Sequence, residues 1–331
     1  MRITSSAPTR IDLAGGTMDI WPLYLFHEDA QTINAAISLR ARCELTPLDN
    51  GRIEIASADT GRTVNASHWS ELRGNHELKL IGHLLHFFRA GGLRVSTRSE
   101  SPVGAGIAGS SALNIAVCGA VAAWQGSTLE DDVLLQVAMN VEAQAIDVPT
   151  GAQDFRPALY GGISAVELRP DGVRRVALDV DPAAFQAHIL LAYTGASRQS
   201  GINNWEVTKR HIDGDRAVFE RFERIRDIAI TMRDALARGD WTEVGRQIGE
   251  EWENRKRLAP GVSTTGIERL ISTARGAGAQ AAKICGAGGG GCMIVFAEPE
   301  RLPAVRSALV SAGARVLDYR VETQGLIVDR G

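Results

Sequence analysis

The sequence predicts an α+β fold that is divided into two domains. Helical and strand-like segments are mixed unevenly along the 331 residues, without the regular βαβ alternation of a parallel-sheet protein. A chain of this length has room for two hydrophobic cores. Near residues 179–182 the sequence changes from short strands to long amphipathic helices. We therefore expect an N-terminal domain over 1–180 and a C-terminal domain over 181–331.

The expected N-terminal domain combines β-branched runs with three helical patterns. The turn signal Asn50-Gly51 precedes a short alternating run, and Gly91-Gly92 ends the first helical pattern. Strands are expected at 2–6, 10–14, 32–46, 52–56, 63–66, 93–99, 163–168 and 173–178, and helices at 77–90, from about 112 to 124, and at 129–146.

The expected C-terminal domain begins with a compact apolar strand and continues with long amphipathic helices. A glycine-rich loop separates two further apolar strands. Strands are expected at 188–193, 280–285, 292–297, 314–317 and 320–328, and helices at 200–211, 215–238, 240–257, 264–277 and 299–312.

The composition indicates an ordinary globular protein, with 44% hydrophobic and 23% charged residues. A net charge of −3 offers no general attraction for nucleic acid or anionic membranes. No apolar run reaches the roughly 20 residues of a membrane helix, and a signal-peptide core is absent. We expect a cytoplasmic protein without nucleic-acid or membrane partners. Four cysteines lack paired spacing and are expected to be reduced core residues: Cys43, Cys118, Cys285 and Cys292.

A glycine-rich loop over residues 101–112 follows an expected strand and precedes an apolar helix. Its glycines let backbone amides approach a ligand, and the helix start adds positive potential, so the loop is suited to phosphate. Ser110 and Ser111 stand where the helix begins, with hydroxyls that can cap it or bind a cation. The GxGxxG spacing over 104–109 also matches the dinucleotide fingerprint, and a structural turn is the third alternative. No acidic residue ends a following strand, which disfavours an NAD(P)-dependent oxidoreductase.

Charged residues near the start and middle of the chain are not explained by core filling. Arg10 and Asp12 lie on a short strand that ends in Gly15-Gly16, and Asp154 follows a glycine turn. Arginine suits the recognition of developing negative charge, and aspartate can act as a general base. The alternatives are an ion pair of Arg10 with Asp12 or Asp154 that only holds loops together, and an Asp154 that caps a short helix.

Glu142 lies in the apolar stripe of its expected helix, beside Ala138 and Ile146. A carboxylate on a buried face is costly unless it is paired or binds a metal. With a serine hydroxyl nearby, hard oxygen ligands suit magnesium. A glutamate at the edge of the apolar face is the alternative.

The second glycine-rich loop contains five glycines within residues 286–291. Such a run carries an entropic cost that a plain hairpin does not need, so we expect its backbone to pack closely against a ligand or another loop. The flanking Cys285 and Cys292 have no neighbouring His or Cys as metal partners, and no histidine lies in any of these stretches. A histidine-dependent catalytic triad is therefore not expected.

Together these stretches resemble the three ordered motifs of the GHMP small-molecule kinases. The motifs fall near the start, in the middle and near the end, so the resemblance covers nearly the whole chain. The segments RIDLAGG with Asp19, GAQDFRPALYGG and LAYTGASR (191–198) are most similar to the sugar-kinase branch, which includes fucose and heptose 7-phosphate kinases. The resemblance implies a two-domain fold with ATP and the acceptor bound in the cleft between the domains.

The resemblance also implies roles for individual residues. Asp154 would take the proton from the attacking hydroxyl, and Arg10 would orient Asp154 and steady the transferred phosphoryl group. Ser110, or Ser111 in its place, would bind Mg²⁺ together with Glu142. The implied ATP-phosphate-binding residues are Gly104, Ala105, Gly106, Ile107, Ala108, Gly109, Ser110 and Ser111. The implied substrate-binding residues are Thr17, Met18, Asp19, Trp21, Tyr193, Arg198, Gly288 and Gly289, of which Arg198 could bind a phosphate on the acceptor.

We therefore expect an ATP- and Mg²⁺-dependent kinase that phosphorylates a hydroxyl of a sugar or sugar phosphate, such as a heptose 7-phosphate, with the anomeric hydroxyl favoured. One alternative is a kinase for a non-sugar alcohol such as mevalonate or phosphomevalonate. Another is a catalytically silent protein that binds a sugar and ATP. The protein is expected to be a monomer or a homodimer.

Overall fold

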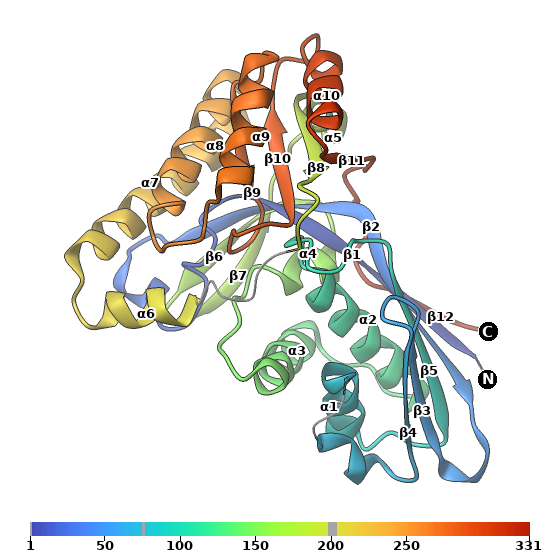
Figure 1. The fold of residues 1–331 in the computed structure, drawn as a ribbon. Coiled ribbons are helices and arrows are strands. Elements are labelled where there is room, and N and C mark those ends of the chain that lie inside the picture. The colour runs from blue at the N-terminus through green and yellow to red at the C-terminus, as the bar shows by residue number, and fades with distance from the viewer. Residues whose placement is uncertain (1, 75–76, 198–203) are drawn as a thin grey trace.

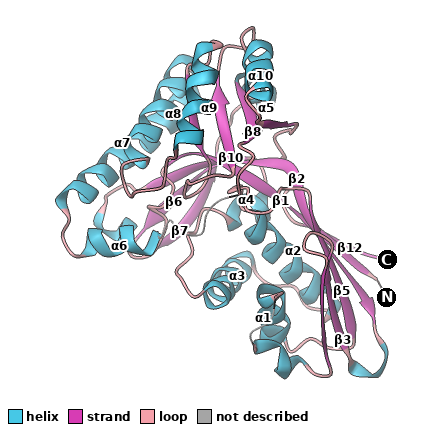
Figure 2. Ribbon diagram, in the orientation of Figure 1, coloured by secondary structure: helices cyan, strands magenta, loops and turns pink. Residues whose placement is uncertain are grey.

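The computed structural model of the chain describes residues 2–74, 77–197 and 204–331. Two separate sheets organise it: an eight-stranded sheet and a four-stranded sheet, each covered by helices (Figure 1). In Figure 1 the smaller sheet and α7 to α10 form the upper part, and α1 to α3 lie below, beside the larger sheet. The mixture of helices and strands, separated by colour in Figure 2, confirms the α+β class.

The larger sheet has the order β12-β1-β2-β5-β3-β4, with β6 paired to β2 and β7 paired to β6. Its pairs are antiparallel except for β3 with β5. The central strands β1 and β2 are buried along most of their length because helices cover both of their faces. The strands are β1 Ile3–Ala14, β2 Gln31–Pro47, β3 Ile53–Ser57, β4 Arg62–Ala66, β5 Leu93–Ser99, β6 Ile163–Arg169, β7 Gly172–Ala177 and β12 Ile327–Arg330.

The first strand is one element, whereas the sequence predicted two. β1 runs through Pro8, where its register against β2 shifts between Pro8 and Thr9. An irregularity at this point accommodates a residue that has no N–H to donate to the ladder. Arg10 and Asp12 therefore lie in the C-terminal half of one long strand.

The N-terminal helices are α1 Lys79–Phe88, α2 Gly109–Trp124, α3 Asp131–Ile146 and α4 Phe155–Tyr160. The alanine-rich α2 packs against β1 and β2, while α1 and α3 pack against α2. Nearly all of α2 is buried, as expected from its small apolar side chains. The glycine-rich loop that precedes α2 is thus attached to the best-buried helix of this part of the molecule.

The smaller sheet has the order β11-β8-β10-β9 and is antiparallel throughout. α8 packs against β9, and α7 reaches across to β1 and β2 of the larger sheet. The strands are β8 Ile189–Tyr193, β9 Ala281–Ile284, β10 Cys292–Phe296 and β11 Arg315–Leu317. The helices are α5 Pro182–His188, α6 Asn204–Ile212, α7 Arg216–Arg238, α8 Trp241–Arg255, α9 Thr265–Gly276 and α10 Leu302–Ser311.

Two elements of this part differ from the sequence prediction. α5 was missed, although Asp181 caps it and Pro182 occupies its first turn. The predicted strand over 320–328 was wrong: only β12 at the end is a strand, and Val321 makes an isolated bridge to Ile37. β12 pairs with β1, so the end of the chain returns to the larger sheet. The domain limits at residues 180 and 181 stay a prediction.

The expected burial of the cysteines agrees with the fold. The four cysteines are free and buried. None of the described helices combines the length and the apolar character needed to cross a membrane.

Arg40 anchors the returning C-terminal segment to the larger sheet. Its buried guanidinium donates to the carbonyls of Ser6, Gln324 and Gly325 at 2.5 to 3.0 Å, and it forms an ion pair with Glu322. Removal of this side chain would leave three carbonyl oxygens without that donor.

Arg40→Met is predicted to lower the free energy of unfolding by about 2–4 kcal/mol, because buried acceptors lose their donors. Urea denaturation followed by circular dichroism measures the change. Arg42→Met is the matched control, because the exposed Arg42–Glu100 ion pair contributes at most about 1 kcal/mol. Equal destabilisation by the two variants would show that the buried contacts of Arg40 do not anchor the C-terminal segment.

Candidate active site

A cavity of about 520 Å³ opens beside the glycine-rich loop that precedes α2. Its wall is formed by the loop after β1, the β3–β4 turn, the start of α1, the loops before α2 and α4, and the second glycine-rich loop. Most of the predicted site residues meet here. Those in the wall are Arg10, Thr17, Asp19, Gly104, Ala105, Gly106, Ala108, Gly109, Ser110 and Asp154.

The loop before α2 turns carbonyl oxygens toward the protein. Arg10 donates to the carbonyl of Gly106 through Nη1 and to that of Ile107 through its backbone N–H, both at 3.1 Å. Gly104 and Gly106 have φ values of 70° and 72°, which glycine adopts without strain. Among the described residues, no protein group accepts a hydrogen bond from the amides between Gly106 and Ser111. These amides and the start of α2 make an anion-binding surface.

The two serines do not cap α2. The N-cap position is taken by Ala108, whose side chain cannot accept a hydrogen bond. Instead, Ser110 Oγ donates to Glu142 Oε1 at 2.6 Å and Ser111 Oγ donates to Glu142 Oε2 at 3.1 Å. Ser110 lies in the cavity wall, while Ser111 is buried behind it. This placement favours Ser110 over Ser111 as a cation ligand.

Glu142 is buried on the face of α3 that packs against α2. Ala138 is buried beside it, whereas the predicted stripe member Ile146 is half exposed. Burial, together with the negative charge of Asp154, raises the pKa of Glu142 to about 7, although hydrogen bonds from the serines oppose this shift. A bound cation would favour the ionised carboxylate that burial disfavours. The burial of Glu142 excludes the alternative that it lies at the edge of the apolar face of its helix.

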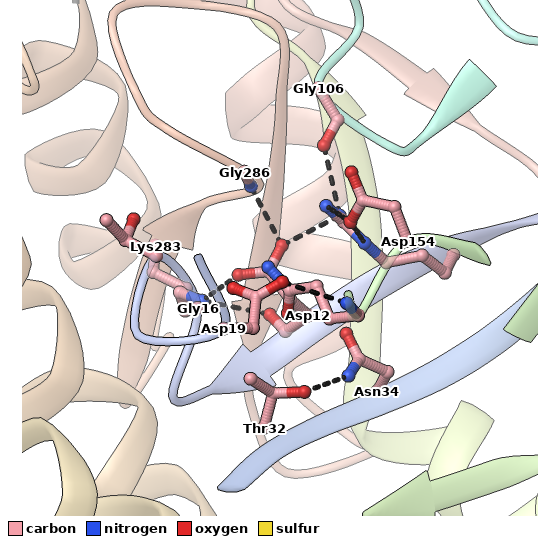
Figure 3. A network of polar contacts seen from close by, with 12 residues as sticks. Asp12, Gly16, Asp19, Thr32, Asn34, Gly106, Asp154, Lys283 and Gly286 are labelled. Carbon is pink, nitrogen blue, oxygen red and sulfur yellow. Dashed lines mark hydrogen bonds and ion pairs between the residues drawn. The ribbon is translucent and has the colours of Figure 1, made fainter. Parts of the chain in front are cut away.

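Arg10 is held between Asp12 and Asp154, both of which are labelled in Figure 3. Its Nε and Nη2 donate to Asp154 Oδ1 at 2.9 and 2.6 Å, and its Nη1 donates to Asp12 Oδ1 at 2.9 Å. Burial opposes the charge of Arg10, but attraction to Asp154 and Asp12 raises its pKa above the ordinary value. Both ion pairs considered from the sequence are present. Arg10 and Asp154 line the cavity, whereas Asp12 is fully buried and is not part of the wall.

Asp154 directly precedes α4 at its N-cap position, but its side chain makes no capping hydrogen bond. The carboxylate is 30% exposed, in contrast to the 2% of its partner Arg10. Helix capping therefore does not explain this residue. Its geometry leaves carboxylate surface open to the cavity while one oxygen stays fixed by the guanidinium.

Asp19 reaches the cavity from the loop after β1. Its Oδ2 accepts a hydrogen bond from the Gln153 N–H at 2.8 Å and lies where a side chain at Gly151 would clash, with 2.1 Å to an added Cβ. Burial and the charge of Asp154 raise the pKa of Asp19 to about 6. A glycine is therefore required at position 151, in the turn before Asp154, because the Asp19 carboxylate lies against the backbone there.

Several predicted substrate-binding residues are not placed in the cavity wall. Met18 is fully buried in an apolar cluster, and Trp21 is 66% exposed outside the wall. Tyr193 lies at the end of β8, where Arg315 covers its ring. Arg198 lies outside the described residues.

The second glycine-rich loop packs against other loops rather than the cavity at most of its positions. The Gly289 N–H donates to the Val262 carbonyl at 2.8 Å, and an added Cβ at Gly288 would lie 2.6 Å from that oxygen. An added Cβ at Gly291 would lie 2.5 Å from the carbonyl of Ala105 in the first loop. The structure therefore does not place Gly288 and Gly289 against a substrate, and the loop supports the first glycine loop from behind.

Three charged residues of the C-terminal half extend the network of ion pairs around Arg10. The sequence predicted no role for any of them. Lys283, Glu251 and Arg255 are fully buried and connect to Asp12 and the loop after β1. Glu251 and Arg255 lie in the buried stripe of α8, four residues apart. The same signal that singled out Glu142, a charge within an apolar helical stripe, was present at these two positions.

Comparison with known proteins agrees with this geometry. Residues 75–162 match the model of the GHMP kinases N-terminal domain, and residues 232–315 match that of the GHMP kinases C-terminal domain. Together the two matches cover just over half of the chain. Fold and site define a small-molecule phosphotransferase with an alcohol group as acceptor. The chain belongs to the GHMP kinase family.

Individual relatives cover almost the whole chain. It is 29% identical to D-glycero-alpha-D-manno-heptose 7-phosphate kinase from Campylobacter jejuni, over 98% of each chain. It is 27% identical to mevalonate kinase from Thermococcus sibiricus, over 99% of each. Among solved structures, a D-glycero-D-manno-heptose 1-phosphate kinase from Bacteroides thetaiotaomicron superposes with a TM-score of 0.80 at 26% identity, over 99% of each chain.

Glu142→Gln is predicted to stabilise the ligand-free protein above neutral pH. The folded pKa of about 7 lies above the ordinary value of 4.5, so the folded state binds this proton more tightly than the unfolded state. The cost of the ionised carboxylate is therefore absent below pH 4.5 and fully present above pH 7. At about pH 8 the substitution should raise the free energy of unfolding by an amount on the order of 2 kcal/mol.

Urea denaturation at about pH 8 and about pH 5 measures this difference, most of which should be lost at the lower pH. Glu28→Gln, at an exposed glutamate, is the control and should show no such dependence. Destabilisation by Glu142→Gln at both pH values would show that the protein favours the carboxylate over the acid.

Proposed function

We propose that this chain transfers the γ-phosphoryl group of ATP to a hydroxyl of a sugar or sugar phosphate, with the anomeric hydroxyl as the favoured position. One observation carries the proposal. A single cavity holds amides at the start of α2 that have no acceptor among the described residues, a serine bound by a buried glutamate, and an aspartate bound by a buried arginine. Each of these groups has a place in phosphoryl transfer, which depends on positioning and charge neutralisation.

ATP fits the described wall. The amides between Gly106 and Ser111 suit phosphate oxygens, and the φ values of Gly104 and Gly106 bring the backbone close to them. The rest of the wall, from the β3–β4 turn and the start of α1, includes apolar side chains such as Leu78 and Ile81. A cavity of about 520 Å³ is within the range of small-molecule sites.

Mg²⁺ fits the donor set, because Ser110 and Glu142 offer the oxygen ligands that this ion prefers. No group of three or more metal-binding acidic, histidine or cysteine side chains exists within the described ranges, so phosphate oxygens and water would complete the coordination. When bound, the ion supplies neutralisation of charge on the phosphate oxygens.

The residues of the chain supply the remaining functions. Asp154 accepts the proton of the acceptor hydroxyl as the acceptor oxygen bonds to the γ-phosphorus and the bond to the leaving ADP oxygen breaks. Arg10 holds Asp154 in place through two hydrogen bonds, and its fixed charge offsets the negative charge that develops on the transferred group.

The acceptor class rests on Asp19 and on the relatives. Asp19 lines the cavity near Asp154 and is suited to accept hydrogen bonds from sugar hydroxyls. The basic side chains in the described wall are those of Arg10 and Lys79. The proposed phosphate contact of Arg198 falls outside the described residues. A phosphorylated sugar is supported by the names of the heptose phosphate kinases to which the chain is similar.

A panel of acceptors scored by ADP release tests the proposal. The panel contains heptose 7-phosphate, the free heptose, fucose, galactose, mevalonate and phosphomevalonate. We expect a sugar or sugar phosphate to be turned over with a higher kcat/KM than mevalonate, because Asp19 and Asp154 together match a polyhydroxyl acceptor.

The panel also separates the alternatives. Preference for mevalonate or phosphomevalonate would replace the sugar assignment, in line with the mevalonate kinase relatives. ATP binding by calorimetry without turnover of any acceptor would point to a silent binding protein.

A further inference from the structure

A chain of buried charged groups extends from Arg10 away from the cavity. Lys283, in β9, is fully buried, and its Nζ donates to Asp12 Oδ2 at 2.6 Å and to the Asp12 carbonyl at 2.9 Å (Figure 3). The same Nζ lies 3.5 Å from Glu251 Oε2. Lys283 therefore lies behind the candidate active site and is not among the residues that line the cavity.

Asp12 is the joint between this lysine and Arg10. Its Oδ1 accepts hydrogen bonds from Arg10 Nη1 at 2.9 Å and from the Gly286 N–H at 2.8 Å, while Oδ2 accepts from Lys283. Burial opposes ionisation, but attraction to Lys283 and Arg10 lowers the pKa of Asp12 below its usual range. Both carboxylate oxygens are thereby engaged, and the carboxylate has one orientation.

The orientation of Arg10 follows from that of Asp12. The guanidinium is planar, so a fixed Nη1 also fixes the direction of Nε and Nη2 toward Asp154. Nη1 simultaneously donates to the Gly106 carbonyl and so connects this plane to the glycine loop. Rotation of the Asp12 carboxylate would displace the contacts of Arg10 with the loop and with Asp154.

We propose that Lys283 is a positioning residue for phosphoryl transfer: it anchors the Asp12 carboxylate and, through it, sets the plane in which Arg10 holds Asp154 and the glycine loop. This inference rests on the proposed function, because it assigns Arg10 and Asp154 to the reacting groups. Lys283 itself touches neither substrate.

Stability alone does not account for a lysine at this position. A buried ion pair contributes little compared with apolar residues of similar volume, because desolvation offsets the attraction. The network also extends to the acceptor side of the site. Glu251 is bound by Arg255, and Arg255 donates to the Gly16 carbonyl at 2.8 Å and to Thr17 Oγ1 at 3.0 Å, in the loop that carries Asp19.

Three variants test the role: Lys283→Met, the double variant Asp12→Asn/Lys283→Met, and Arg40→Met as a control for the loss of a buried cation that does not line the cavity. Each is measured for kcat, for KM of ATP and acceptor, and for Tm. The acceptor is whichever member of the panel the unmodified enzyme uses best.

Lys283→Met is expected to lower Tm by roughly 5–10 °C, because it leaves Asp12 without its main partner. It is also expected to lower kcat about 100-fold, with KM values changed by less than about threefold, because the reacting groups are misplaced rather than lost. The double variant should regain Tm, since it leaves neither charge buried alone, but should keep the low kcat. Arg40→Met should lose Tm and keep kcat.

Recovery of kcat together with Tm in the double variant would overturn the proposal, because the lysine would then serve stability alone. Equal losses of kcat in Arg40→Met and Lys283→Met would overturn it as well. If Lys283→Met does not fold, the double variant decides the question. Failure of the proposed function is distinguishable, because it shows in the acceptor preference of the unmodified enzyme.

Discussion

The active site depends on how the charge of Arg10 is held inside the protein. A guanidinium that is 2% exposed is stable only with ionised partners, and Asp12 and Asp154 provide them on opposite edges. These contacts bring together β1, the loop before α2, the start of α4 and, through Lys283, β9. Segments that are far apart in sequence therefore meet at one side chain. The exposed part of Asp154 is the point at which this buried network reaches the cavity.

Backbone packing gives the first glycine-rich loop its shape. The two glycine-rich loops lie back to back: an added Cβ at Gly106 would lie 2.8 Å from the Cys285 carbonyl, and one at Gly286 would lie 2.9 Å from the Gly106 carbonyl. Because the loop's carbonyls are engaged from behind, its amides remain for a ligand. Gly286 and Gly291 of the second loop pack against the first loop, whereas Gly288 packs against Val262 and Gly290 against Ala196. Only Gly286 and Ala287 of the second loop reach the cavity wall.

Much of this arrangement could be predicted from residue patterns. The GxGxxG loop, the serines after it and the carboxylate of Glu142 within an apolar stripe are local signals, and the α+β class follows from element order. The sequence indicated Asp12 and Asp154 as candidate partners of Arg10 but did not decide between them, because an ion pair between Asp154 and Arg10 spans 144 positions in the sequence. Lys283 escaped notice because its neighbours are assembled by the tertiary fold. Met18 and Tyr193 do not line the cavity, because proximity in sequence to a motif does not fix the direction of a side chain.

The central claim is that Asp154, held by Arg10, acts in the transfer step rather than in nucleotide binding. The most direct test compares kcat with the Kd of ATP for Asp154→Asn and for Asp171→Asn, a control at an exposed aspartate that does not line the cavity. The account predicts a fall in kcat of about 10²–10⁴-fold for Asp154→Asn with the Kd of ATP nearly unchanged, and no effect for the control. Full kcat in Asp154→Asn, or a loss confined to ATP affinity, would contradict it.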